Sequence, residues 1–376
     1  MLTRLYIDNF LCFSNFELRL ESLTLLLGEN GSGKTSIIEL IDRIRRFVIG
    51  GTDIDAFAPS STLTRWDSRN DQKFTLAATV EDEEFEYELV IRHTDDRMKR
   101  KVLTERLASK GDTLFLFDEE AVVHLHNNAG DERATMPFDW SQSSLGRMQE
   151  RQENTRLFRF RNWLKNIQLA RPDPRYVHSR SEMSKSSIKP DLSDFAAWLR
   201  GHFETGPQGP AALDNALKGV LEGFETLLNQ DLGGSLRRLQ ARFRLAGDES
   251  DAKPIDFSFE ELSDGQRQLV MLYALLLLGF DSGRTLMIDE PDNFLALSEI
   301  QPWLNRLEEQ REDKGGQVIL VSHHPEVLNQ VAIDHGTWLW REGCDPVRAR
   351  RFSEIADRFA DSLTSAEIVA RRWTEE

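Results

Sequence analysis

The sequence predicts an α/β fold: a mixed sheet with flanking helices, antiparallel strands at the N-terminus, and a compact, mainly helical insertion. Three observations point to the sheet. Two short apolar segments, Thr285–Ile288 and Gln317–Ser322, are separated by a helical pattern, which is typical of a parallel βαβ unit. A glycine-rich loop, Gly28–Thr35, joins an apolar strand to an amphipathic helix. Residues 1–27 alternate in the manner of strands.

These elements divide the chain into three parts. An N-terminal lobe, residues 1–105, holds the first strands and a β-hairpin made of Phe74–Val80 and Glu84–His93. Residues 106–255 mix amphipathic helices with loops and sustain no heptad pattern, so we expect a compact, mainly helical insertion and no coiled-coil arm. A C-terminal lobe, residues 256–376, holds the two apolar strands and four helices, over Ser263–Phe280, Leu297–Glu312, Pro325–Val331 and Thr364–Trp373.

Composition is that of an ordinary globular protein. Of the 376 residues, 40% are hydrophobic and 29% are charged. The longest apolar run, Leu269–Phe280, is shorter than the roughly 20 residues that cross a bilayer, and the N-terminus lacks the pattern of a secretory signal. Cys12 and Cys344 show no metal-binding spacing and fit a reducing compartment. We therefore expect a cytoplasmic protein without a membrane partner.

Charge is distributed unevenly along the chain. The formal net charge of −16 argues against a surface that binds nucleic acid throughout. Between Arg147 and Lys189, however, basic residues predominate and aromatic residues are interleaved. Two interpretations stay open: a solvated helix face, or a surface for nucleic-acid phosphates or a partner protein. The basic residues are Arg147, Arg151, Arg156, Arg159, Arg161, Lys165, Arg171, Arg175, Arg180, Lys185 and Lys189.

The segment Gly28–Thr35 matches the pattern G-x-x-x-x-G-K-[ST], and helical spacing follows over Ser36–Val48. Such a loop wraps backbone N–H groups around a β-phosphate, and the helix N-terminus adds positive potential. Lys34 would reach the β- and γ-phosphates, and the Thr35 hydroxyl would bind Mg²⁺. The predicted nucleotide-binding residues of this segment are Glu29, Asn30, Gly31, Ser32, Gly33, Lys34, Thr35 and Ser36.

Polar residues follow both apolar strands of the C-terminal lobe, at the sheet edge where ligands of parallel sheets bind. Asp289 would hold Mg²⁺ through water, and Glu290 would orient or deprotonate the attacking water. His323 would sense or stabilise the γ-phosphate, with His324 as a competing candidate. The plain alternative, a strand cap made by Asp289 and Glu290, is disfavoured by the glycine loop.

The string Leu262–Gln266, LSDGQ, opens the helix Ser263–Phe280. Ser263 at the N-cap, the Gly265 amide and the helix dipole would form a second anion site, in which Gln266 takes part. The same string also suits a simple helix start. Its position shortly before the paired carboxylates argues against coincidence.

These four motifs, in this order, resemble the head of ABC-type P-loop ATPases, whose signature is LSGGQ. The wide gap between the glycine loop and the signature is similar to that of the SMC, RecF and OLD branch. Two longer stretches, ELSDGQRQLVMLYALLLLG and LMIDEPDNFLALSEIQPWL, look like stand-alone prokaryotic AAA/ABC ATPases, including ATPase subunits of antiphage modules of the Septu and PARIS type. The resemblance covers most of the chain.

The resemblance implies ATP and Mg²⁺ as ligands and ATP hydrolysis as the activity, with Glu290 and His323 as catalytic residues. It implies a homodimer through an ATP sandwich, in which Ser263, Gly265 and Gln266 contact the nucleotide of the opposite subunit. Such relatives work with a separately encoded nuclease. We therefore expect a switch or clamp that gates an effector in antiphage defence, with nucleic acid as a further possible partner.

The chain departs from the family pattern in three places. Ala296 stands where the D-loop of transporters has aspartate, Gln72 is a weak Q-loop candidate, and the about fifty residues after His324 are too few for a Toprim domain. The main alternative is a RecF- or SMC-like ATPase of DNA repair or maintenance. Weaker alternatives are the nucleotide-binding subunit of a transporter and a head that binds ATP but hydrolyses it slowly.

Overall fold

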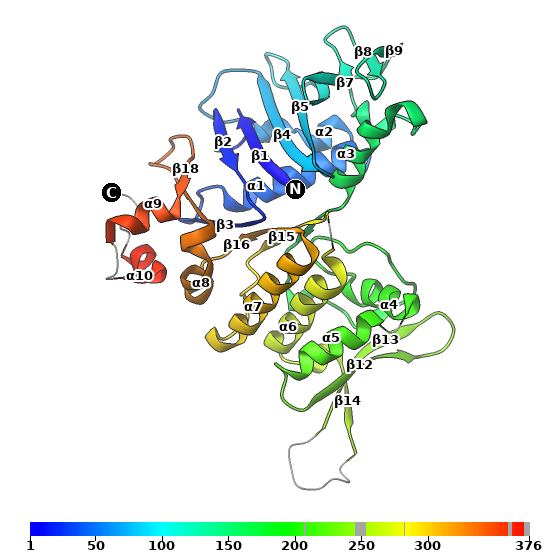
Figure 1. Cartoon of the computed structure of the whole chain (residues 1–376), viewed down its shortest axis with the longest axis vertical. Coiled ribbons are helices and arrows are strands. Elements are labelled where there is room, and N and C mark those ends of the chain that lie inside the picture. The colour runs from blue at the N-terminus through cyan, green and yellow to red at the C-terminus, as the bar shows by residue number, and fades with distance from the viewer. Residues whose placement is uncertain (207, 245–252, 282, 360–362, 372–376) are drawn as a thin grey trace.

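The computed structural model describes residues 1–376 except 207, 245–252, 282, 360–362 and 372–376, and it places two lobes on opposite sides of a central sheet (Figure 1). The described strands of the central sheet run parallel except for the last, which pairs antiparallel. Their order is β10 (Ile167–Ala170), β15 (Thr285–Asp289), β16 (Gln317–Val321), β3 (Leu23–Gly28), β17 (Gly336–Trp340) and β18 (Arg348–Arg351).

The central strands are apolar along their whole length because side chains on both faces are buried. Met287 and Ile319 pack into the core of the lobe above the sheet in Figure 1, called the upper lobe. Their neighbours Leu286 and Leu320 pack into the core of the lobe below it, called the lower lobe. Strands that are covered on both faces show continuous apolar runs with no polar alternation. One sheet therefore serves two hydrophobic cores.

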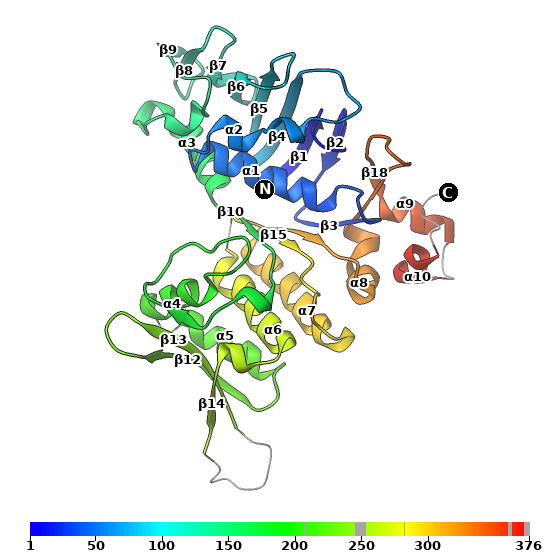
Figure 2. The same ribbon diagram turned by 180° about the vertical axis from the view of Figure 1, so that it is seen from behind.

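The upper lobe is built on an antiparallel sheet whose described strands follow the order β2 (Phe16–Arg19), β1 (Leu2–Asp8), β4 (Asp71–Val80), β5 (Glu83–His93), β6 (Arg100–Ser109), β7 (Asp112–Phe117), β8 (Val122–His126) and β9 (Glu132–Pro137). Three helices pack on it: α1 (Lys34–Val48), α2 (Ile54–Phe57) and α3 (Thr155–Lys165) (Figure 2). Helix α1 also contacts β3 and β10, so it lies between the two sheets.

The lower lobe covers the other face of the central sheet with helices and adds a small antiparallel sheet. The helices are α4 (Phe195–Thr205), α5 (Gln208–Lys218), α6 (Asp264–Ala274), α7 (Leu297–Lys314) and α8 (Pro325–His335), and α9 (Phe352–Ala356) and α10 (Ser365–Ala370) pack beside α8. The small sheet contains β11 (Arg180–Ser181), β12 (Phe224–Asp231), β13 (Arg237–Phe243) and β14 (Ile255–Ser258).

The predicted fold class is confirmed, but the mainly helical character of residues 106–255 is a wrong prediction. In the described residues, helices α3 to α5 of this segment are outnumbered by strands β7 to β13. Strands β7 to β9 extend the upper sheet, β10 joins the central sheet, and β12 and β13 form a hairpin across Gly233 and Gly234. Strands β9, β12 and β13 mix polar with apolar residues and lack a continuous apolar run, so they are easily mistaken for loops or amphipathic helices. The boundaries at 105 and 255 stay predictions.

Within the described part of the chain, no helix combines the length and the apolar character that a bilayer crossing needs.

A buried carboxylate ties the upper sheet to the segment that leads into α3. Glu105 of β6 is fully buried and accepts hydrogen bonds from the Tyr87 hydroxyl at 2.8 Å and the Ser143 hydroxyl at 2.6 Å. Its other oxygen accepts from the Ser144 amide at 2.9 Å, the Ser144 hydroxyl at 3.0 Å and the Leu145 amide at 3.2 Å. Burial raises the pKa of Glu105, and these donors act in the opposite direction.

We expect Glu105→Ala to lower the free energy of unfolding by about 3 kcal/mol or more, because it leaves a set of buried donors without an acceptor. Urea unfolding followed by circular dichroism measures this loss. The matched control is Glu88→Ala on β5, which removes a partly exposed ion pair with Lys73 and should cost less than about 1 kcal/mol. Equal losses in the two variants would contradict the role given to Glu105.

Candidate functional site

The glycine loop lies between β3 and α1 and fits its surroundings only without side chains at two positions. Gly28 has φ +144°, and a Cβ there would lie 2.1 Å from the carbonyl oxygen of Leu339 on β17. Gly33 has φ +93°, and a Cβ there would lie 2.6 Å from the Phe13 ring. Because glycine tolerates both the conformation and the close approach, the loop can curl tightly against the sheet.

The Lys34 ammonium is turned onto the loop that precedes it. Its Nζ donates to the carbonyl oxygens of Gly28 and Glu29, each at 2.8 Å. Burial lowers the pKa of Lys34 to about 8, while the carboxylates of Asp289, Glu290 and Glu29 act to raise it. A phosphate group in the loop would offer this cation a full negative charge in place of neutral carbonyls.

Two oxygen-bearing side chains meet at the carboxyl end of β15. The Thr35 hydroxyl of α1 lies 3.4 Å from Oδ1 of Asp289. Burial raises the pKa of Asp289, and the Arg171 charge and the Thr35 hydrogen bond act to lower it. Mg²⁺ prefers hard oxygen ligands and usually takes only one or two from protein, with phosphate and water completing its shell. The pair of Thr35 and Asp289 fits that requirement.

Glu290 is held in a constrained backbone conformation at the start of the loop that follows β15. Its φ of 52° lies in the left-handed region, which non-glycine residues seldom adopt. Its amide donates to the carbonyl oxygen of Val321 at 2.8 Å, and its carboxylate accepts from the Asn293 side chain at 2.7 Å. Backbone and side chain are thus both fixed, as is common where a residue serves a functional site.

The two histidines after β16 have different surroundings. His324 caps helix α8, and its Nδ1 accepts a hydrogen bond from the Glu326 amide at 3.3 Å. His323 instead faces the cavity beside the glycine loop. Partial burial and the Lys34 charge lower the pKa of His323, with Glu290 acting in the opposite direction. Burial therefore favours the neutral form of the His323 ring.

A cavity of about 340 Å³ brings most of the predicted residues together. Glu290 and His323 line it on one side, and three residues that the motifs did not indicate, Leu11, Cys12 and Arg341, line it as well. The glycine-loop residues that line it are Asn30, Gly31, Gly33, Lys34, Thr35 and Ser36. The remaining two, Glu29 and Ser32, line a neighbouring cavity of about 580 Å³ that also includes Arg341.

The signature segment, Leu262–Gln266, lies outside the cavity formed by the glycine loop, Glu290 and His323 of the same chain. Ser263 caps α6 by accepting from the Gln266 amide at 3.2 Å, and the Gln266 side chain accepts from the Ser263 amide at 3.0 Å. Gly265 lies against the loop after Glu290, since a Cβ there would be 3.1 Å from the Phe294 carbonyl oxygen. None of Ser263, Gly265 and Gln266, all of them described residues, lines the 340 Å³ cavity beside the glycine loop.

The structure adds Arg171, which the motifs missed. Strand β10 pairs parallel with β15, so Arg171, the next residue, emerges at the same sheet edge as Asp289. Its Nε lies 3.2 Å from Oδ2 of Asp289, and its Nη1 lies 2.9 Å from the Glu39 carboxylate. The available signal was a polar residue directly after the apolar segment Ile167–Ala170, the same signal that identified Asp289.

The Q-loop candidate Gln72 takes a structural role. It is fully buried on β4, and its amide donates to the Asn9 carbonyl oxygen at 2.8 Å while its Oε1 lies 3.1 Å from the His93 ring. Burial and the neighbouring arginines lower the pKa of His93 to about 4. Gln72 therefore stabilises the upper lobe and is not itself one of the residues that line the cavity.

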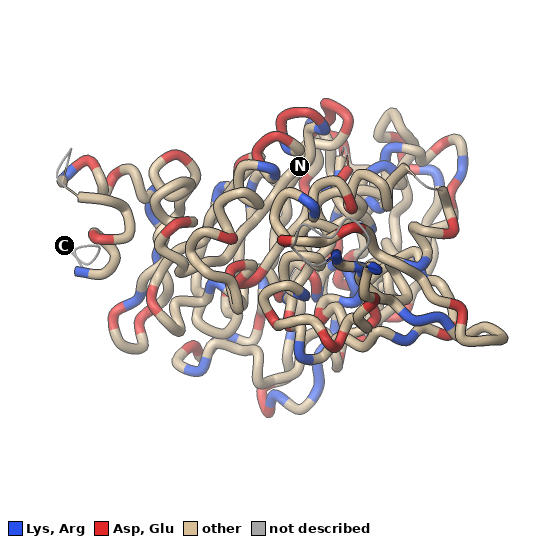
Figure 3. The backbone as a smooth tube through the Cα atoms, turned by 90° about the horizontal axis from the view of Figure 1, so that it is seen from below, with Lys and Arg blue, Asp and Glu red and all other residues tan. Residues whose placement is uncertain are grey.

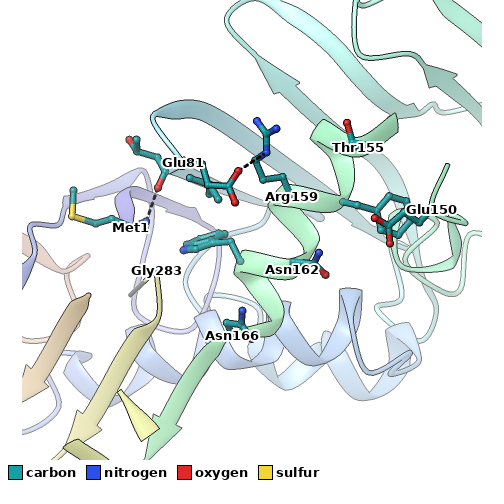
Figure 4. A pocket seen from close by; sticks show the side chains of 12 residues that line it. Met1, Glu81, Glu150, Thr155, Arg159, Asn162, Asn166 and Gly283 are labelled. Atoms are coloured by element: carbon teal, nitrogen blue, oxygen red, sulfur yellow. Dashed lines mark hydrogen bonds and ion pairs between the residues drawn. The ribbon is translucent and has the colours of Figure 1, made fainter. Parts of the chain in front are cut away.

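The arginines of α3, at the centre of the basic run, are engaged by the protein itself. Arg156 Nε donates to Glu83 at 2.5 Å, Arg159 Nη1 donates to Glu83 at 2.8 Å, and Arg161 donates to two backbone carbonyl oxygens. Figure 4 shows Arg159 paired with Glu81 at the rim of a separate cavity of about 460 Å³. Figure 3 shows acidic and basic residues interspersed along the chain. Because groups of the chain itself hold these arginines, the structure argues against α3 as a surface for nucleic-acid phosphates or a partner protein.

The family model described as "AAA domain, putative AbiEii toxin, Type IV TA system" matches residues 23–329. The chain is similar to the solved structure of an Smc head bound to the C-winged helix domain of ScpA, with 13% identity, a TM-score of 0.53 and coverage of 94% of this chain and 99% of that one.

It is also similar to an Smc head domain with an extended coiled coil, bound to the C-terminal domain of ScpA derived from Pyrococcus furiosus. That match has 11% identity, a TM-score of 0.54 and coverage of 95% and 98% of the two chains. At these identities the likeness shows the fold alone, which is that of an ABC/SMC-type P-loop ATPase head. No curated protein sequence matches the chain.

The lowered pKa of Lys34 leads to a pH prediction. Lys34 is charged below about pH 8 in the free protein, and a bound phosphate would hold its proton to higher pH. We therefore expect ATP affinity to be constant below pH 8 and to fall by about tenfold per unit above it, until the pKa of the complex is reached. Fluorescent-nucleotide titrations from pH 6.5 to 9.5 measure this.

The control is Lys34→Arg, because a guanidinium keeps its charge throughout that range. Whatever its absolute affinity, this variant should lack the alkaline decrease. A decrease of the same size in Lys34→Arg would assign the pH dependence to another group.

Proposed function

We propose, from the premise that this chain belongs to the AbiEii-type AAA domain family, that it binds ATP with Mg²⁺ and hydrolyses the ATP at a site completed by a second copy of the chain. One observation carries the proposal. The glycine loop with Lys34 and Thr35 lines the same cavity as Glu290 and His323, with Asp289 3.4 Å from Thr35. These are the groups that hold phosphates, bind a divalent cation and direct a water molecule.

Binding rests on the loop and on α1. Backbone amides of the loop and the positive end of α1 would surround the β-phosphate, and the Lys34 ammonium would turn from the carbonyls of Gly28 and Glu29 to the phosphate oxygens. Arg341, which lines both neighbouring cavities, brings a further positive charge to the same place. When held by Thr35 and Asp289, Mg²⁺ would neutralise charge on the β- and γ-phosphate oxygens.

Hydrolysis requires an attacking water and stabilisation of the charge that develops on the γ-phosphate. The Glu290 carboxylate, fixed by Asn293, would accept a hydrogen bond from that water and orient it. Because the pKa of His323 is lowered, its neutral ring would donate one N–H to a γ-phosphate oxygen. These roles for Glu290 and His323 are part of the proposal.

A second copy would supply the signature. The cavity lacks contributions from the signature of its own chain. Segments that contact the signature or its helix α6 carry exposed apolar side chains: Tyr176 with 61%, Phe294 with 39% and Leu297 with 55% of their surface accessible. Exposed apolar clusters of this kind are common at protein interfaces. We propose that Ser263, Gly265 and Gln266 of each copy close over the nucleotide of the other, giving a homodimer.

Hydrolysis would remove the phosphate that joins the two copies, and the dimer would loosen. We propose that this change is passed to a separately encoded effector, such as a nuclease in antiphage defence. The family description names a toxin of a type IV toxin–antitoxin system, and both Smc head structures are heads bound to a domain of another protein. A role in DNA maintenance is the second candidate, but the arginines of α3 lend it no support.

The dimer proposal predicts that Glu290→Gln accumulates as a dimer in ATP and Mg²⁺, because the nucleotide that joins the copies is no longer hydrolysed. Light scattering during size-exclusion chromatography measures the mass with and without ATP. Glu312→Gln, a change at an exposed glutamate of α7, is the control and should behave like the wild type. A monomeric Glu290→Gln protein that binds ATP would contradict the dimer.

Shared sites predict complementation between two inactive variants. Each site needs Lys34 from one copy and Ser263 from the other. A homodimer of Lys34→Ala lacks the phosphate-binding lysine in both sites, and a homodimer of Ser263→Arg has both signatures blocked, so each variant alone should hydrolyse no ATP. Mixed in equal amounts, they should recover about a quarter of the wild-type rate, because half of the randomly assorted dimers would hold one intact site of two. Absence of recovery from two folded variants would mean that each site lies within one chain.

A further inference from the structure

We propose that Arg171 is a displaceable counter-ion of the metal site: it neutralises Asp289 and Glu39 before Mg²⁺ binds and opposes the entry of the metal. This inference rests on the proposed function, because it concerns the cation site formed by Thr35 and Asp289. It adds a positioning residue that none of the motifs contains.

The two oxygens of Asp289 are shared between different partners. Oδ1 faces the Thr35 hydroxyl at 3.4 Å, on the side of the glycine loop. Oδ2 faces the Arg171 Nε at 3.2 Å. The same guanidinium reaches Glu39 on α1 at 2.9 Å. Arg171 thus lies between two carboxylates and supplies the positive charge at the carboxylate that the metal would use.

The contact between Arg171 and Asp289 is close but incomplete. Among the described residues, no hydrogen-bond partner meets the directional requirement of Arg171 Nε or Nη2, although both atoms are buried. Elsewhere in the chain, Arg175 makes two hydrogen bonds to Asp173, at 2.9 and 2.7 Å. A guanidinium is held most firmly by such paired hydrogen bonds. Arg171 is therefore attracted by charge without being fixed by geometry, which suits a group that must yield to a metal ion.

The backbone around Arg171 is fixed, so displacement would involve the side chain. The Arg171 amide donates to the Pro190 carbonyl oxygen at 2.6 Å, and Pro172 follows directly. Arg171 is also kept near Asp289 by the parallel pairing of β10 with β15. The side chain retains 34% of its surface exposed, which leaves room for a change of rotamer.

Charge decides the expected effect. A divalent cation close to Asp289 would meet the full positive charge of Arg171 at short range, and like charges at such distances interact strongly in partly buried surroundings. Removing the guanidinium would also release Glu39 as a second acidic group near the metal. We therefore expect Arg171→Gln to bind a divalent cation about tenfold more tightly than the wild type.

The test is a titration with Mn²⁺, followed by electron paramagnetic resonance, on the full chain without nucleotide and with a non-hydrolysable ATP analogue. Arg171→Gln should bind Mn²⁺ about tenfold more tightly in both titrations. Arg175→Gln is the matched control, because it removes the same charge from the same segment without touching Asp289, and it should match the wild type. Nucleotide affinity in EDTA should be the same in all three proteins.

Two results would overturn the proposal. Equal Mn²⁺ affinity in Arg171→Gln and the wild type would show that the guanidinium does not oppose the metal. Loss of nucleotide affinity in EDTA would show that Arg171 binds phosphate instead. Failure of the proposed function is a separate result: the wild type would then bind no ATP analogue, whereas the titration with Mn²⁺ alone would still report on Arg171.

Discussion

The parallel pairing of buried strands in the central sheet is the constraint on which the rest of the structure depends. Parallel strands end at one edge, so β3, β15, β16 and β10 place the glycine loop, Asp289, His323 and Arg171 side by side. Both faces of these strands are buried, and their register is therefore strongly specified, because a slip of one residue would exchange the side chains of the two cores. The precision of the site is a property of the sheet.

Charge at this edge is balanced by groups that must change partners. Lys34 is bound to backbone carbonyls, Arg171 lies between Asp289 and Glu39, and burial disfavours the charged forms of both Lys34 and Asp289. Lys34 would gain from a ligand that brings phosphate charge, and Asp289 from a divalent cation, whereas Arg171 would yield its place beside Asp289 to that cation. The protein alone therefore leaves interactions at this sheet edge incomplete, which fits the proposed binding of ATP and Mg²⁺.

The sequence predicted those parts of the fold and the site that are marked by a continuous apolar strand or a known loop pattern. Lys34 was found from the glycine-loop pattern after β3, and Asp289 and His323 from the polar residues at the ends of β15 and β16. Their placement at one cavity or beside it agrees with that expectation. Arg171 follows a strand of only four residues inside a basic run, so its position was hidden. The strands β12 and β13 of the segment 106–255 were missed because they mix polar and apolar residues and show no continuous apolar run. Which face a short strand buries depends on partners distant in sequence.

The two lobes meet the central sheet on opposite faces, and this arrangement has a consequence for how such a protein can diversify. Alternate residues of β15 and β16 belong to separate cores, so substitutions that remodel one lobe leave the packing of the other unchanged. Asp289, His323 and Arg171 lie at the ends of strands and belong to neither core. New loops or helices could therefore be acquired by either lobe, and new binding partners with them, while the chemistry at the sheet edge is preserved.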